Sequence, residues 1–265
     1  MIHAGDERVP PPSPPRLPGT VVYRPCFDDL IDAVLADLLL QSQSCVRAFG
    51  DFHLAVCASE RIEPALVRLM LDPMYRSLPW KRTHLWMADD CVVGADDDRS
   101  RAKRMREILV EHSDIPVDQV HGIPVTSRDP GGQYQADLQE SLAWREKGQD
   151  RLDFALLTLA DGGPVSAALA GASGLADDGD LVIRRAWRCR EGLEWYGLST
   201  RMISATRLIA IVATGTTARD AVRAIAPSHG GRPPRDIRPI GGELRWYLDQ
   251  TACPDEPGSP SVESP

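Results

Sequence analysis

The chain has 265 residues, of which 43% are hydrophobic and 26% charged, a composition typical of a globular protein. The formal net charge is −8 and no block of Lys or Arg occurs, which disfavours nucleic acid and an anionic membrane as partners. No run approaches the ~20 apolar residues that span a bilayer, and the proline-rich amino end lacks the apolar core of a secretory signal, so a cytoplasmic location is expected.

Both ends of the chain are predicted to be disordered. Residues 1–19 are rich in proline, which favours neither a strand ladder nor a helix, and residues 251–265 form a tail rich in Pro, Ser and acidic residues. Residues 20–250 contain no internal repeat and no linker. We therefore expect one domain between two disordered ends.

Within this domain, apolar runs alternate with amphipathic stretches. In chain order, strands are expected at 20–24, 52–57, 83–88, within 115–124, and at 152–159, 181–187, 195–198, 207–213 and 241–248. Helices are expected at 25–47, 62–71, 100–112, 133–147, from 164 onward and at 214–225, with an acidic loop over 89–98. This alternation predicts an α/β protein with a single doubly wound, mostly parallel, Rossmann-like sheet and helices on both of its faces.

The stretch 152–171 joins a buried strand to a helix through a tight glycine turn. The turn is Ala160-Asp161-Gly162-Gly163, and the helix begins at Pro164, where a proline is tolerated because the first N–H groups of a helix lack internal partners. A glycine turn between a strand and a helix N-terminus is a place where an anion or a reacting group can bind. We therefore take this turn as the candidate site.

This stretch resembles the 6-phosphogluconolactonase family, whose members carry G-x-G-x-D-G-H-x-A-S after the strand. Residues 78–90 resemble the family segment that ends in S-D-E-R, while Ser100 and Lys103 fall where the family has S-N-x-R. Residues 115–121 resemble its I-P-x-x-x-V-H segment, and 195–221 its closing strand and G-x-x-K helix start. Because the matches occur in order over 21–248, the resemblance implies the α/β fold of the glucosamine-6-phosphate isomerase/6-phosphogluconolactonase type.

The resemblance also implies a reaction, and this chain departs from the residues that would perform it. In the family, the histidine of D-G-H is the expected base, and a G-G-S-T-P loop with basic residues holds the sugar phosphate. Here Pro164 replaces that histidine, and Ala218 replaces the lysine of G-x-x-K, although Gly215 is retained. The phosphate loop carries Glu60 and Glu63, which would repel an anion. These departures predict a degenerate site.

Three acids are candidates for a replacement catalytic group, namely Asp161, Asp89 and Asp90. The candidate substrate- or phosphate-binding residues are Ser59, Arg61, Gly162, Gly163, Gly215, Thr216, Thr217 and Arg219. The run 214–219 has a strand exit, a glycine and a helix start, which suits an anion but equally suits a plain helix cap. The acids of 89–98 are interpreted as a solvated loop that caps the helix at Ser100, because their spacing fits no calcium loop.

Histidines and cysteines do not suggest another catalytic centre. His53, His84 and His121 could each be proposed as a base, but their places in or beside strands favour hydrogen-bonded, half-buried side chains. None of the six cysteines forms a C-x-x-C pair, which favours neither a zinc site nor a redox dithiol. We expect no cofactor and no metal.

The leading hypothesis is a 6-phosphogluconolactonase-like protein of the pentose phosphate route with little or no lactonase activity. It would bind a phosphorylated sugar or lactone, or regulate a protein partner of unknown identity. The alternative is a working lactonase that hydrolyses 6-phospho-D-glucono-1,5-lactone to 6-phosphogluconate with substituted residues. A third hypothesis is an enzyme acting on another small phosphorylated substrate.

Overall fold

A computed structural model describes residues 14–143, 145–146, 150–170, 180–182, 187–189, 192–234 and 237–255. Its main element is a seven-stranded sheet in the order β1-β10-β9-β6-β2-β3-β5, in which every neighbouring pair is parallel. The strands are β1 (Thr20–Tyr23), β2 (Phe52–Val56), β3 (Thr83–Met87), β5 (Val120–His121), β6 (Phe154–Thr158), β9 (Leu208–Ala213) and β10 (Glu243–Leu248). The predicted α/β class and parallel sheet are confirmed.

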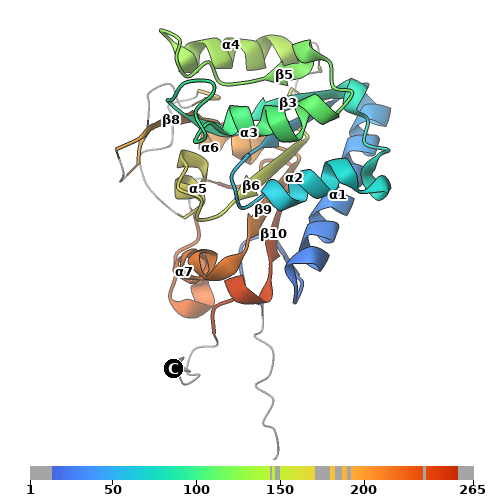
Figure 1. The fold of residues 1–265 in the computed structure, drawn as a ribbon. Helices are drawn as coiled ribbons and strands as arrows, with labels where there is room; N and C mark the ends of the chain where they lie inside the picture. The colour runs from blue at the N-terminus through green and yellow to red at the C-terminus, as the bar shows by residue number, and fades with distance from the viewer. Residues whose placement is uncertain are drawn as a thin grey trace, which may run out of the picture.

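The helices are α1 (Phe27–Phe49), α2 (Glu63–Leu71), α3 (Arg101–Ile108), α4 (Pro130–Leu142), α5 (Pro164–Leu169), α6 (Thr200–Ala205) and α7 (Gly215–Ile225). In Figure 1, α1 lies to the right of the central strands and α5 and α7 lie to their left. Two helices differ from expectation. Helix α4 begins at Pro130 and ends at Leu142 rather than spanning 133–147, and α6 was not predicted. No helix of the described residues is long and apolar enough to cross a membrane.

Helix α1 shows why the apolar pattern was informative. Its buried side chains recur at the spacing of one helix face, which packs against β2, β6 and β10. The helix ends at Gly50, which has a φ of 93° and donates its N–H to the Val46 carbonyl. Only glycine adopts this left-handed conformation without steric cost, so the chain turns here into β2.

A second, small antiparallel sheet was not predicted. It contains β4 (Asp89–Cys91), β8 (Glu194–Gly197) and β7 (Trp187–Arg188) in the order β4-β8-β7. The first residues of the expected acidic loop therefore form a strand. Asp89 is 0% exposed and Asp90 1% exposed, so the interpretation of this part of the loop as solvated was wrong.

The ordered fold reaches beyond 20–250 at both ends. Leu17 packs against the core, and the Pro18 carbonyl accepts a hydrogen bond of 2.7 Å from Trp246 Nε1. At the other end Ala252 and Cys253 are buried behind a short 3-10 turn at Gln250–Ala252. Residues 1–13 and 256–265, on which most of the expected disorder falls, lie outside the described residues.

Three histidines form a stacked cluster on β2, β3 and β5. The rings of His53 and His84 lie 4.5 Å apart, those of His84 and His121 5.3 Å apart, and Trp86 stacks on His121 at 3.6 Å. The Asp137 carboxylate lies 2.9 Å from His121 Nδ1, which is therefore the protonated nitrogen, and His121 Nε2 accepts from His84 Nδ1 at 3.0 Å. These histidines are hydrogen-bonded as expected, but only His84 is half-buried, since His53 is 0% exposed and His121 7% exposed.

The same cluster contains the carboxylate of Asp51. Donor atoms of Asp51, His53 and His84 lie within 4.8 Å of one another, a spacing that a metal ion could bridge. However, Trp86 Nε1 donates to His53 Nδ1 at 3.1 Å, so the remaining proton of neutral His53 is on Nε2, where it bonds Asp51 at 2.9 Å. Because His53 then offers no free lone pair, its geometry does not favour metal binding.

The histidine cluster predicts a pH dependence of stability. Burial and the neighbouring His53 and His121 lower the pKa of His84 from 6.5 to about 4. Between these values the unfolded chain binds a proton that the folded chain does not, so the free energy of unfolding falls as pH drops from about 6.5 to about 4. We expect the melting temperature of His84→Gln to depend less on pH over this window than that of the wild type. His112→Gln, at an exposed position, is the control, and equal slopes for all three proteins would contradict the assignment.

Candidate functional site

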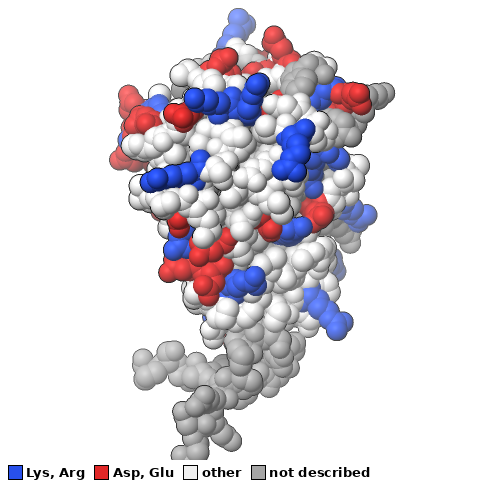
Figure 2. Space-filling view, turned by 90° about the vertical axis from the view of Figure 1, so that its right-hand side faces the viewer, with Lys and Arg blue, Asp and Glu red and all other residues white. Residues whose placement is uncertain are grey.

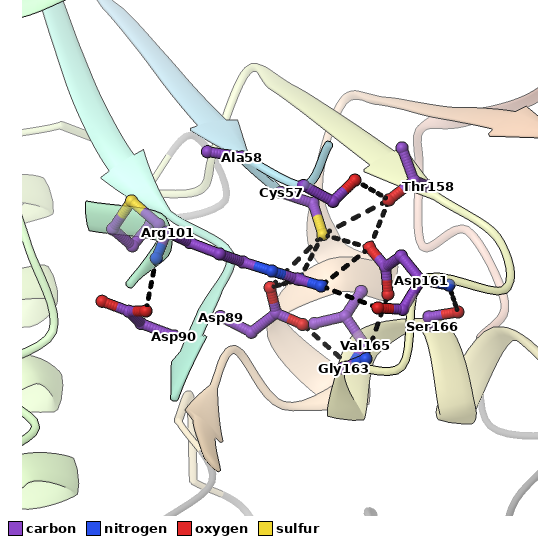
Figure 3. Close-up of polar contacts among 12 residues, drawn as sticks. Cys57, Ala58, Asp89, Asp90, Arg101, Thr158, Asp161, Gly163, Val165 and Ser166 are labelled. Atoms are coloured by element: carbon purple, nitrogen blue, oxygen red, sulfur yellow. Dashed lines mark hydrogen bonds and ion pairs between the residues drawn. The ribbon is translucent and has the colours of Figure 1, made fainter. Parts of the chain in front are cut away.

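Several strand ends meet at one edge of the large sheet, because parallel strands place their carboxyl ends on the same side. Cys57 follows β2, Asp89 lies just beyond β3, and Asp161 lies just beyond β6. Cys57 bonds both acids, and all three side chains bond Arg101, the first residue of α3 (Figure 3). We refer to Cys57, Asp89, Arg101 and Asp161 as the central cluster.

Arg101 holds the central cluster together. Its Nη1 donates to Asp89 Oδ1 and, over 2.8 Å, to Cys57 Sγ. Its Nη2 lies 3.2 Å from both Asp161 Oδ2 and the Asp161 carbonyl oxygen. The Trp195 ring centroid is 4.7 Å from Arg101 Cζ. Arg101 is 3% exposed, so its guanidinium fills the space between the two carboxylates.

Burial and the charge of Arg101 act on the two acids in opposite directions. Burial raises the pKa of Asp89, and Arg101 offsets this only in part. Burial also acts to raise the pKa of Asp161, but Arg101 and several hydrogen bonds outweigh it and hold that pKa below its usual value. Burial disfavours charge on Arg101, yet Asp89 and its neighbours raise the pKa of the guanidinium well above the usual range. Asp161 and Arg101 thus form a charged pair at neutral pH.

Cys57 is a hydrogen-bonding member of the cluster. Burial raises the pKa of its thiol well above the usual value. The protonated thiol lies 2.9 Å from Asp161 Oδ2, and Thr158 Oγ1 donates to the same carboxylate oxygen. Because a thiolate is the reactive form of cysteine, this environment does not favour nucleophilic chemistry at Cys57.

Asp90 points away from the central cluster. Its carboxylate accepts hydrogen bonds from the backbone N–H groups of Arg101 at 2.8 Å and Ala102 at 3.2 Å, and from Ser100 Oγ at 3.3 Å. Asp90 therefore caps the start of α3, as the sequence suggested for this acidic run, but it does so from a buried position. It is not placed to act on a ligand at the sheet edge.

The glycine turn after β6 closes over the central cluster. Gly163 N–H donates to Asp161 Oδ1 at 3.1 Å, and a Cβ at Gly163 would collide with the Asp89 carboxylate and Arg101. Gly162 is exposed, with a φ of 84°. Ala160 has a φ of 62°, which is uncommon for a residue with a side chain. The turn is thus packed directly onto the ion pair.

A cleft of about 450 Å³ lies beside the central cluster, within the usual size range of small-ligand sites. Among the residues that line it are Ser59, Glu60, Arg61, Arg99, Arg104 and Trp195. Ser59 is buried and lies 3.0 Å from Thr158 Oγ1 through its hydroxyl. No histidine lines this cleft in the part of the chain that the structure describes.

The arginines of the cleft differ in their partners. Arg99 pairs with Asp97 at 2.8 Å, and Arg104 lies 3.5 Å from Glu60 and 3.2 Å from Glu63. Glu60 and Glu63 are therefore neutralised by α3, so the expected repulsion of an anion by this loop is weaker than the sequence implied. Arg61 donates its Nε–H to the Ala160 carbonyl at 3.0 Å. Across the described residues, no carboxylate pairs with Arg61.

The start of α7 lies next to Arg61, since a Cβ at Gly215 would be 3.9 Å from Arg61 Nη1. Thr216 and Thr217 are exposed in the first turn of this helix. Arg219 turns to the carboxyl end of the chain, where its Nε donates to the Thr251 carbonyl at 2.8 Å. The structure thus brings Arg61 and Gly215 together and leaves Arg219 bound elsewhere.

Sequence reasoning did not place Arg101 between the two carboxylates, and it did not identify Cys57 or Trp195 as site residues. Arg101 stands where the resembled family pattern S-N-x-R has its asparagine, so a substitution from amide to guanidinium was the available signal. Cys57 looked like one of several isolated buried cysteines, and Trp195 like one residue of a strand. Only the spatial meeting of β2, β4, β6 and β8 reveals that the three belong together.

The central cluster predicts a large stability loss when Arg101 loses its charge. Arg101→Met keeps the apolar stem but leaves two buried carboxylates without a positively charged partner, which we expect to lower the free energy of unfolding by about 3–5 kcal/mol. Urea unfolding at pH 7 measures this loss. Arg104→Met, which breaks pairs with exposed acids, is the control and should cost within about 1 kcal/mol. Similar losses for both variants would contradict a special role for Arg101.

Known proteins similar to this chain share most of its length. 6-Phosphogluconolactonase from Nostoc sp. is 24% identical over 239 residues, which cover 88% of this chain and 96% of that protein. The Mycobacterium leprae 6-phosphogluconolactonase is 26% identical over 193 residues, covering 69% and 77%. The human GDH/6PGL endoplasmic bifunctional protein is 26% identical over 238 residues, which cover 85% of this chain but only 29% of that longer protein.

Solved structures share the fold at low sequence identity. 6-Phosphogluconolactonase from Thermotoga maritima superposes with a TM-score of 0.70 at 15% identity, covering 87% of this chain and 99% of that one. A monomeric glucosamine-6-phosphate deaminase superposes with a TM-score of 0.71 at 13% identity, covering 88% and 98%. The model of one family matches residues 26–246. The chain therefore belongs to the glucosamine-6-phosphate isomerases/6-phosphogluconolactonase family.

Proposed function

We propose that this protein is a member of the family that binds a phosphorylated sugar or lactone in the cleft but has little or no lactonase activity. Its role would be binding or regulation in the pentose phosphate route. The observation that carries the proposal is the position of Arg101, which fills the space between Asp89 and Asp161. The other features below support it.

Hydrolysis of a lactone requires a base that activates water and donors that stabilise the developing oxyanion. The acids placed to replace the missing histidine, Asp89 and Asp161, have side chains that are 0% and 1% exposed and are both bound to Arg101. The pKa of Asp161 is held below its usual value by Arg101, which makes this carboxylate a poor base. Burial raises the pKa of Asp89, but Arg101 occupies the Asp89 carboxylate and blocks the access that water would need. Pro164, at the family's histidine position, can supply neither a base nor a backbone N–H.

Other features favour retention of ligand binding. Arg61 is a cation without a carboxylate partner among the described residues, and it lies beside Gly215 at the start of α7. Gly215 N–H already donates to Thr251 Oγ1 at 3.0 Å, so the helix start would offer the N–H groups of Thr216 and Thr217. Together with a neighbouring guanidinium, such N–H groups form a favourable site for a phosphate. In addition, the Trp195 side chain has a buried Nε1–H without an acceptor in the described structure, a group that a ligand oxygen can satisfy.

The absence of lactonase activity is directly testable. We expect the purified protein to consume 6-phospho-D-glucono-1,5-lactone no faster than the spontaneous reaction, because losing a general base alone typically costs on the order of 10²- to 10⁴-fold. The rate of acid release at constant pH measures this, with the Nostoc 6-phosphogluconolactonase as the active control. Turnover well above the spontaneous rate would overturn the proposal in favour of a working lactonase, and Asp161→Asn and Asp89→Asn would then identify its base.

Ligand binding gives a second prediction. Titration calorimetry with 6-phosphogluconate should detect binding to the wild type, and Arg61→Gln should weaken it by about tenfold to a hundredfold, the value of one hydrogen bond to a charged group. Arg223→Gln, in the last turn of α7 where Arg223 lies near Asp220, serves as the control and should bind as the wild type does. If the wild type does not bind, or if both variants bind equally, the proposed phosphate contact is wrong.

A further inference from the structure

The face formed by α1, α2 and the short turn after α2 exposes several large apolar side chains. Leu40 is 65% exposed, Leu71 73% and Met74 67%. Met74 lies alongside α1, because Tyr75 OH bonds Asp32 at 3.2 Å and Gln43 Nε2 bonds Ser77 Oγ at 3.3 Å, which fixes residues 73–77 along α1. Leu71 is the last residue of α2, just before this segment. Leu40 lies on α1 between these two contacts. Scattered single apolar residues need no explanation, whereas a group of this kind indicates an interaction site.

The same face carries an excess of positive charge. Residues 39–50 and 71–82 contain four cations and one acid, Asp72, whose carboxylate accepts from the Met74 N–H at 2.9 Å, although the whole chain has 38 acidic residues and a net charge of −8. The four cations, all exposed and without a carboxylate partner among the described residues, are Arg47, Arg76, Lys81 and Arg82. Arg82 is close to the end of α1, since Thr83 pairs with Phe52 just after that helix. Figure 2 views this side and shows a broad uncharged area with Lys and Arg side chains along it.

The fold does not need all of these cations. Arg47 lies in the last turn of α1, where a positive charge complements the helix dipole. Arg76, Lys81 and Arg82 lie on the segments between α2 and β3. By contrast, Arg68 on the same face pairs with Asp28 at 3.1 Å and Asp32 at 3.0 Å. The chain thus neutralises the cation at one end of the face and leaves the other end positive.

We propose that this face docks a partner protein whose contacting surface is acidic and contains apolar side chains. Leu40, Leu71 and Met74 would pack against the apolar side chains, and the four cations would meet the acidic rim. A protein suits the face better than nucleic acid or a membrane does. The apolar side chains are Leu and Met rather than aromatic residues that stack on bases, and a net charge of −8 opposes binding to polyanions.

The test uses the full chain and a random peptide library displayed on phage. Peptides selected on the wild type should be rich in Asp and Glu around Leu, Ile, Phe or Trp. Their affinity, measured by fluorescence anisotropy, should fall as salt rises from 50 to 300 mM because the exposed charges are screened. Hydrogen–deuterium exchange should then show protection over residues 39–50 and 73–82. Peptides without acid enrichment, or protection of another face, would overturn the proposal.

Substitutions separate the apolar contribution to peptide binding from the electrostatic one. Leu40→Ser with Met74→Ser removes apolar contacts, and Arg76→Glu with Arg82→Glu reverses the charge; each pair should weaken binding at least tenfold. Arg76→Gln with Arg82→Gln is the milder version if charge reversal prevents folding, which melting curves will show. Val117→Ser and Arg223→Glu, on other surfaces, should bind as the wild type does. Equal binding by all variants would overturn the proposal, as would binding of RNA, of anionic vesicles or of a second copy of this chain through the same residues instead of acidic peptides.

Discussion

Burying the Arg101 guanidinium costs several kcal/mol of hydration, and this cost is offset only where oxygen acceptors surround the group. Two carboxylates and the Asp161 carbonyl supply them here. The bonds join β4 and the neighbouring α3 to the turn after β6, where Asp161 lies 60 positions beyond Arg101. The ion pair thus sets how these segments pack, and its position in the space beside the strand ends also determines what chemistry remains available there.

Consecutive aspartates reach opposite sides of the same residue because successive side chains of a strand alternate in direction. Asp89 accepts from the Arg101 side chain, whereas Asp90 accepts from the Arg101 backbone N–H at 2.8 Å. One short strand therefore both caps α3 and neutralises the guanidinium that α3 presents. A loop of the same sequence would place neither carboxylate reliably, whereas the pairing of β4 with β8 fixes the backbone that carries both.

The strands of the large sheet could be predicted from the sequence because they are continuous apolar runs such as 208–213. The turn at 160–163 could be predicted from its glycines. The sequence did not predict strand β4, since two adjacent aspartates indicate a solvent-exposed segment unless a buried cation is known to pair with them. That cation, Arg101, looked like one more charge at a helix start. Local patterns thus predicted backbone arrangement well, whereas the central cluster depends on contacts between residues up to 104 positions apart.

Charge pairing also decides what the cleft can hold. Of the arginines that line it, Arg99, Arg101 and Arg104 are matched by Asp97, by Asp89 and Asp161, and by Glu60 and Glu63. A matched guanidinium offers an anion little, because its hydrogen-bonding positions are taken and its charge is compensated. Arg61 is different, since it bonds only a carbonyl in the described structure and lies beside the start of α7. Departures from the family's pattern at the central cluster therefore do not by themselves imply loss of anion binding, because the ion pairs of the cluster involve Arg101 whereas the proposed phosphate contact involves Arg61.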